Sequence, residues 1–147
     1  MTAINKYLPA VTTTLLGSML VLFGVNGFLN FMPMPAPKGD AGAFMGGLAA
    51  AGYFFPLLKI TEIVVGLALL TRRLVPLALT ILAPITINIV AFHLFLAPEG
   101  LPLALFILVA NLGLAFHHAK AFRGILAVST YATSAGKPSG KASLAAA

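Results

Sequence analysis

Four long apolar segments dominate the sequence and leave few folds open to it. They cover residues 8–31, 53–71, 74–96 and 101–118. A helix needs about 20 mainly apolar residues to cross the hydrocarbon core of a bilayer. Across the chain 60% of the residues are hydrophobic and 8% are charged, whereas soluble domains carry about 25% charged residues. The sequence therefore predicts an all-α integral membrane protein, in which a four-helix bundle forms one domain over residues 1–123.

The segments between the apolar stretches contain clear helix breakers. The stretch "MPMPAPKGD", residues 32–40, holds three prolines and a glycine, so it is not regular helix. In residues 40–52, Asp40 as N-cap and Gly52 at the far end predict a short helix, which we expect to lie at the outer membrane interface. Beyond the fourth segment the composition shifts to Ala, Ser, Gly and Thr. We expect residues 124–147 to form a flexible cytoplasmic tail.

The basic residues predict the orientation of the chain in the membrane. Seven of the nine fall on one side of the four predicted spans: Lys6, Arg72, Arg73, Lys120, Arg123, Lys137 and Lys141. The opposite side has Lys38, and Lys59 lies inside the second span. By the positive-inside rule both termini are cytoplasmic. The net charge of +6 is explained by this topology, so we expect the lipid bilayer and no nucleic acid as partner.

Two charged residues lie inside the second apolar segment and are expensive there. Lys59 and Glu62 are three residues apart, so they share one face of a helix. A charge at the centre of a bilayer costs roughly 2.5–3.5 kcal/mol, so the two side chains should pair, face the bundle interior or meet water. Because lysine precedes glutamate, the less favourable order, we expect a third partner for each. The candidates, from predicted depth, are Asn26, Asn88 and His93.

Lys59, Glu62 and their candidate partners form a predicted polar cluster in the outer half of the bundle. Two further residues are weaker candidates for this cluster. Asn30 lies near the outer end of the first span and Asn111 near the middle of the fourth. His93 has two interpretations, an interfacial anchor or a member of the cluster. Because the chain has no cysteine, thiol and thiolate chemistry is excluded. We expect no metal site, no covalently bound cofactor and no catalytic set, and the sequence does not favour an enzyme acting alone.

Several stretches in order carry a family resemblance. They are "NGFLNF", "GYFFPLLKITEIVVGLALL", "PLALTILAPITINIVAFHLFL" and "PEGLPLAL". Together they resemble the DoxX-like family of small membrane proteins over about residues 8–123. The resemblance implies a multi-pass four-helix bundle in a bacterial-type plasma (inner) membrane, without implying one activity. The wider group includes a subunit associated with thiosulfate:quinone oxidoreductase and partners of membrane oxidoreductase complexes. Thiol chemistry of relatives does not carry over, since this chain lacks cysteine.

Three functions remain open from the sequence. In the first, the chain is an accessory or interaction subunit, attached to a membrane redox complex or to copies of itself, and the polar cluster holds the helices in register. In the second, a quinone or another amphiphile binds from the outer half, with Lys59, His93 and Asn88 as donors and Glu62 as proton acceptor. The third is a small transporter, which is disfavoured because the inner half has few polar residues beyond small hydroxyls such as Thr80.

Overall fold

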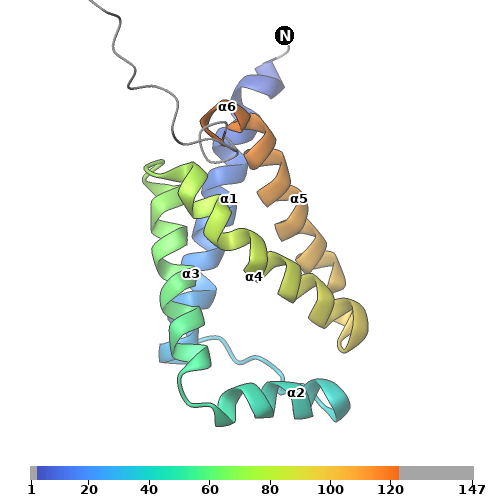
Figure 1. Ribbon diagram of the computed structural model, residues 1–147. Helices are drawn as coiled ribbons and strands as arrows, with labels where there is room; N and C mark the ends of the chain where they lie inside the picture. The colour runs from blue at the N-terminus through green and yellow to red at the C-terminus, as the bar shows by residue number, and fades with distance from the viewer. Residues whose placement is uncertain (1–2, 123–147) are drawn as a thin grey trace, which may run out of the picture.

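The computed structural model describes residues 3–122, which form helices joined by short connections (Figure 1). The elements are α1 (Ala3–Leu29), α2 (Gly39–Ala50), α3 (Phe54–Leu70), α4 (Val75–Phe95), the 3-10 helix η1 (Pro98–Gly100), α5 (Leu101–His117) and α6 (Ala119–Phe122). No strand occurs in this part of the chain. The predicted all-α class is therefore confirmed. The predicted tail, residues 124–147, lies outside the described residues.

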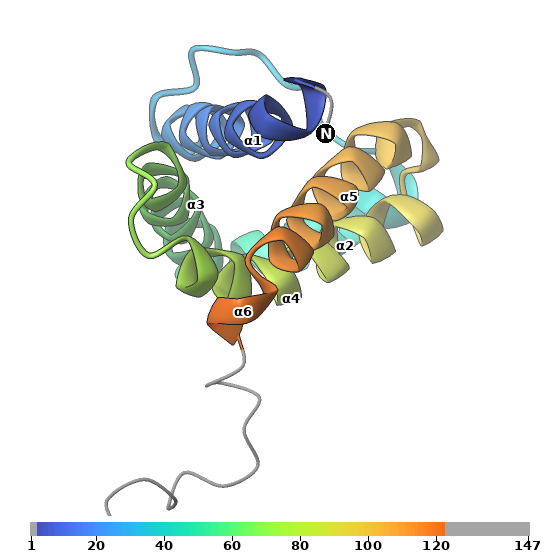
Figure 2. The same cartoon turned by 90° about the horizontal axis from the view of Figure 1, so that it is seen from above.

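The four long helices are arranged in the order α1, α3, α4 and α5 around a common centre (Figure 2). Each runs antiparallel to the next along the chain. The start of α1, the α3–α4 turn and α6 lie at one end, which we call the α6 end (Figure 1). The connection after α1, the helix α2 and η1 lie at the opposite end, which we call the α2 end. Among the described basic residues, Arg72, Arg73 and Lys120 belong to the α6 end, and Lys38 precedes α2 at the α2 end.

Three helical stretches are long and apolar enough to cross a membrane, namely Tyr7–Leu29, Val75–Phe95 and Pro98–His117. The helix α3 passes the same test only together with α2, from which a bend of 90° separates it. Its 17 residues extend about 26 Å, close to the lower limit for a spanning helix. The count is thus three, or four if α2 and α3 make one broken span.

The predicted short helix before the second apolar segment is confirmed, but its predicted cap is wrong. The helix α2 begins at Gly39, and its N-cap is Lys38 in an extended conformation without a side-chain cap bond. Asp40 is already the second helical residue. Gly39 has φ +59°, which glycine adopts without the strain that other residues suffer. The turn into the helix therefore falls on Lys38–Gly39, and the N-cap lies two residues earlier than the sequence pattern predicted.

The apolar core lies towards the α6 end. Its buried side chains come from all four long helices: Leu16, Leu20, Val65, Leu69, Val75, Ala78, Leu79, Leu82, Ile107, Ala110 and Leu114. The buried residues nearer the α2 end include the polar side chains of Asn26, Glu62 and Thr86. Helices α1 and α3 make the most extensive contact, and a Cβ on Gly66 would lie 2.8 Å from the Gly17 carbonyl oxygen. This close approach of the two backbones requires glycine.

Candidate functional site

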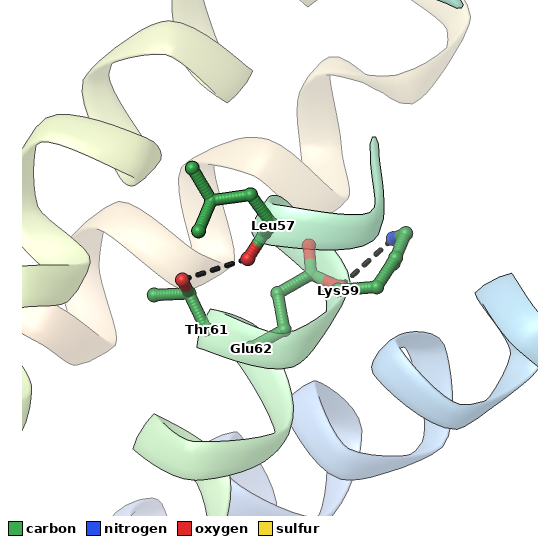
Figure 3. Close-up of polar contacts among 4 residues, drawn as sticks. All are labelled: Leu57, Lys59, Thr61 and Glu62. Atoms are coloured by element: carbon green, nitrogen blue, oxygen red, sulfur yellow. Dashed lines mark hydrogen bonds and ion pairs between the residues drawn. The ribbon is translucent and has the colours of Figure 1, made fainter. Parts of the chain in front are cut away.

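Lys59 and Glu62 form an ion pair on α3, the only one among the described side chains. The Lys59 Nζ donates to Glu62 Oε2 at 2.8 Å (Figure 3). The pairing that the sequence allowed is therefore observed, together with burial of the Glu62 side chain. Thr61 lies on the side of the helix away from Lys59 in Figure 3, and its hydroxyl donates to the Leu57 carbonyl at 2.8 Å. The helical spacing therefore separates the charged face from the neighbouring hydroxyl.

The two partners differ in how far they are buried. The Glu62 side chain is 8% exposed and the Lys59 side chain 23% exposed. From the start of α3, Lys59 lies about 8 Å along the helix axis and Glu62 about 12 Å. The stem of Lys59 packs against Gly27 of α1, whereas Glu62 Oε1 accepts no hydrogen bond from the described residues. The Glu62 side chain is therefore buried, whereas the Lys59 side chain lies beside an opening.

That opening is a hollow of about 330 Å³ beside the end of α1. We call it the polar hollow. Its lining residues come from α1, from the connection after it and from α3: Phe23, Asn26, Gly27, Asn30, Met32, Pro33, Met34 and Lys59. Among the groups that line it, the Lys59 ammonium carries the only charge. The hollow thus combines one cation, two amides and an apolar wall of methionine, phenylalanine and proline.

Asn26 and Asn30 both line the polar hollow but have different roles. Asn26 is 5% exposed, its Nδ2 donates to the Met32 carbonyl at 3.1 Å, and its Oδ1 accepts from the Met32 amide at 2.7 Å. These two bonds hold the chain as it turns away from α1. Asn30 is exposed, has φ +49°, and its side chain forms no hydrogen bond with the described residues. Asn30 is therefore the amide that remains available to a ligand.

Asn88 does not join Lys59 and Glu62, although the sequence placed it near them. It is exposed, and its Nδ2 donates to the Pro84 carbonyl of its own helix at 2.9 Å. The buried face of α4 includes Leu82 and Thr86. Two residues correspond to about 200° of rotation along a helix, so Asn88 lies nearly opposite Thr86. The rotation of α4 turns this amide away from the polar hollow.

His93 is also separate from the ion pair. Its Nδ1 lies 2.9 Å from the Ala97 carbonyl oxygen, and its ring meets the Phe92 ring edge-on with centroids 5.2 Å apart. The ring also fills the space over Gly100 where a side chain would stand. Two of these three partners, Ala97 and Gly100, belong to the α4–α5 connection, so His93 holds this connection against the end of α4 and does not join the ion pair.

Two buried polar groups lie outside the polar hollow. Asn111 donates from Nδ2 to the Leu79 carbonyl at 3.4 Å and so links α5 to α4. Thr86 is 1% exposed, and its hydroxyl has no hydrogen-bond partner among the described residues. The sequence analysis did not single out Thr86. Threonine in a helix usually bonds the carbonyl four residues earlier, so no pattern in the sequence distinguishes one that does not.

A second, larger hollow of about 490 Å³ lies between α1 and α5. Its walls are mostly aliphatic and aromatic, and the residue with an ionisable side chain among them is His117. Sequence reasoning also missed the apolar wall of the polar hollow, formed in part by Met32 and Met34. The prolines in "MPMP" predicted that the first helix ends there, but the end of a helix does not indicate which of the following side chains fold back over it.

Comparison with known proteins adds no relative to this description. No protein-family model, no curated protein and no solved structure matches the chain.

Proposed function

We propose that this chain is an integral membrane protein, a four-helix bundle that binds a small oxygen-bearing amphiphile in the polar hollow. Membrane insertion is supported by the many large apolar side chains that face outward on every long helix. Among the most exposed are Leu29, Val64, Ile87, Phe95, Val109 and Phe116, at 58–78%. In water so much exposed apolar surface promotes aggregation, whereas in a bilayer it faces lipid.

The proposed orientation places the α6 end in the cytoplasm of a plasma membrane. Among the described side chains, Arg72 and Arg73 in the α3–α4 turn and Lys120 in α6 lie at this end. The acidic Asp40 and Glu99 belong to α2 and η1 at the α2 end. A basic cytoplasmic side follows the positive-inside rule. The polar hollow then opens in the outer half of the membrane.

The observation that carries the ligand proposal is the position of the Lys59 ammonium. It bonds Glu62, and the Lys59 side chain that carries it lines the polar hollow. A purely structural ion pair inside a membrane is best enclosed on all sides, because each charge in hydrocarbon is costly. Lys59 is instead 23% exposed at an opening large enough for a small headgroup. Intramembrane ionisable residues that reach an opening are typical of functional sites.

The chemistry of the hollow favours a neutral ligand with a hydrogen-bond-accepting oxygen. The charges of Lys59 and Glu62 cancel, so an anion would have to compete with Glu62 for the ammonium. A carbonyl oxygen can accept from a remaining Lys59 N–H and from the Asn30 amide without breaking the pair. Met32 and Met34 provide the soft apolar contacts that methionine makes with many shapes of ligand. A quinone headgroup has this combination of carbonyl oxygens and a flat apolar ring.

The second candidate is an accessory subunit of a membrane redox complex, which the resemblance to DoxX-like proteins implies. The observation that favours it is the ion pair itself. Lys59 and Glu62 already neutralise each other at 2.8 Å, so the pair needs no ligand to be stable in a membrane. Under this candidate the pair is structural, and the hollow beside it has no occupant of its own.

Measuring ligand occupancy and stability in the same variants separates the two candidates. The wild-type protein, purified in detergent, is analysed by native mass spectrometry for co-purified lipid and quinone, then titrated with a short-chain quinone. Asn30→Gly removes the free amide while keeping a residue suited to φ +49°. Met34→Ala shortens the apolar wall at an exposed position. Val64→Ala, at an exposed position of α3 that lines neither hollow, serves as the matched control.

We expect Asn30→Gly and Met34→Ala to reduce quinone occupancy about tenfold, since one hydrogen bond or one apolar side chain contributes roughly 1–2 kcal/mol. Their thermal unfolding temperatures should stay close to that of Val64→Ala. If neither variant changes occupancy, or if the wild type binds no quinone or lipid, the ligand proposal is wrong. If Lys59→Met then lowers stability and no variant changes ligand occupancy, the result supports the accessory-subunit candidate.

A further inference from the structure

One face of α4 combines an exposed amide with a regular helix-packing pattern. We infer that this face is the contact surface between two copies of the chain in the membrane, with Asn88 of one copy bonded to Asn88 of the other. This face is separate from the ligand site, because its residues lie on α4 and none of them lines the polar hollow. The inference rests on the proposed membrane insertion and not on the proposed ligand.

The first observation is the unused hydrogen-bonding capacity of Asn88. Its amide makes one bond among the described residues, from Nδ2 to the Pro84 carbonyl, so Oδ1 and the second N–H remain available. Asn88 lies seven residues before Phe95, about 10 Å from the end of α4. In a spanning helix that position is inside the hydrocarbon. Polar residues at such a depth almost always face other protein or a water-filled cavity, yet Asn88 is exposed.

The second observation is the spacing of the residues around Asn88. Six residues form what we call the Asn88 stripe: Leu77, Ile81, Pro84, Asn88, Ala91 and Phe95. Successive members are 4, 3, 4, 3 and 4 residues apart. This 4-3 alternation suits a seam between two helices that cross at a small angle, in which a single polar residue sets the register. Because every face of a helix repeats at this spacing, the stripe is distinguished by its position opposite the buried face of α4, which includes Leu82 and Thr86, and by its one polar residue. Five of the six are exposed and Ala91 is half-buried.

A second copy is the partner that suits this stripe. An amide carries both a donor and an acceptor, so two asparagine side chains can bond each other reciprocally. Two copies inserted with the same topology are related by a rotation axis along the membrane normal, and such an interface joins the same patch on both subunits. The axis places both Asn88 residues at the same depth. The small side chain of Ala91 one turn away allows the two helices to approach.

Introduced cysteines can test the contact because the chain has none of its own. Ile81→Cys places a thiol on the Asn88 stripe while Asn88 stays native. Val109→Cys places one on α5, where the side chain is 68% exposed but outside the stripe. Membranes containing each variant are treated with a mild oxidant, and disulfide-linked dimers are measured by electrophoresis. Each reporter is then combined with Asn88→Leu or Asn88→Gln.

We expect Ile81→Cys to form linked dimers and Val109→Cys to remain monomeric. Asn88→Leu should raise the dimer dissociation constant in vesicles about tenfold, as expected for loss of an interhelical amide bond, and Asn88→Gln should restore much of the affinity. Thermal unfolding of the monomer in detergent and quinone occupancy should not change, which would exclude misfolding as the cause.

Several results would overturn the inference. Equal linking at residues 81 and 109 would indicate random collision, and a wild type that is monomeric in vesicles would leave no dimer to explain. Linking of residue 81 to a different protein would assign the stripe to that partner instead. Alkaline carbonate extraction tests membrane insertion separately, because it releases proteins that are not inserted in the bilayer. A protein that stays with the membrane but is monomeric contradicts only the dimer, whereas one released into solution contradicts both.

Discussion

The stem of Lys59 occupies the space that Gly27 leaves by having no side chain. A Cβ on Gly27 would lie 2.5 Å from Cγ and 2.6 Å from Cδ of Lys59, closer than carbon atoms approach without strain. The α1–α3 contact thereby holds the lysine in the rotamer that brings its ammonium to Glu62. The ion pair on α3 consequently depends on a glycine of another helix, 32 residues earlier in the chain.

Gly27→Ala should therefore destabilise the protein and disturb the ion pair. The Lys59 stem must move to admit the methyl group, and overpacking of this kind costs about 1–3 kcal/mol. Thermal unfolding in detergent measures the loss. Gly113→Ala is the control, because a Cβ there has no atom within 4 Å, and alanine in a helix interior is about as stable as glycine or better. Equal unfolding temperatures for Gly27→Ala and Gly113→Ala would show that the Lys59 stem moves aside without a loss of stability.

The ion pair should show strong coupling in a double-mutant cycle. Lys59→Met leaves the Glu62 carboxylate buried without its partner, and Glu62→Gln leaves the ammonium without its counter-charge. Each single variant should be less stable than wild type, while the double variant Lys59→Met/Glu62→Gln should be less destabilised than the sum of the two. We expect a coupling energy of about 1–3 kcal/mol from chemical or thermal unfolding in detergent. Additive effects would mean that the two groups act independently.

Asn26→Ala should loosen the connection after α1. The variant loses both hydrogen bonds to Met32 and leaves the half-buried Met32 amide without its acceptor, at a cost of about 1–3 kcal/mol. Hydrogen exchange at the Met32 amide should accelerate more than exchange in the middle of α1. Asn30→Gly, which removes a side chain without hydrogen bonds to the described residues, should leave Met32 protected. Unchanged protection in Asn26→Ala would contradict the role assigned to this side chain.

Thr86→Val should preserve or raise stability. The Thr86 hydroxyl is buried with no partner among the described residues, and a buried polar group without a hydrogen bond costs about 1–3 kcal/mol in proteins. Valine has nearly the same shape and removes that cost. Unfolding in detergent should show a gain of up to about 1 kcal/mol. A clear loss of stability would reveal that the hydroxyl makes a hydrogen bond in the membrane-embedded protein.

The helix positions followed from local sequence features. The predicted third and fourth segments, 74–96 and 101–118, contain α4 at Val75–Phe95 and α5 at Leu101–His117. Proline and glycine act through their own backbone geometry, so their effect can be predicted without knowing what packs around them. The exception at Asp40 has the same origin, since Gly39 made the turn that the side-chain rule assigned to its neighbour.

The candidate site was predicted only in part. The spacing of Lys59 and Glu62 on one helix indicated that they could pair, because both positions belong to a single regular element. Asn26 and Asn30 do lie beside Lys59, at the end of α1. Asn88 and His93 bond carbonyls of their own helix or connection instead. Predicted depth placed all of these side chains at similar levels, and depth along a helix says nothing about direction around it.

The sequence by itself thus determined the helical class, the breaks between helices and the charged pair on one helix face, because each depends on neighbouring residues. Only the tertiary structure decided which face of each helix turns inward. In a helix with one polar side, the apolar stripe reveals the buried face. The helix α4 is apolar almost all round, so its rotation is set by packing against α3 and α5. That packing buries Thr86 and turns Asn88 outward. The separate contact between α1 and α3 brings Lys59 against Gly27 beside the polar hollow.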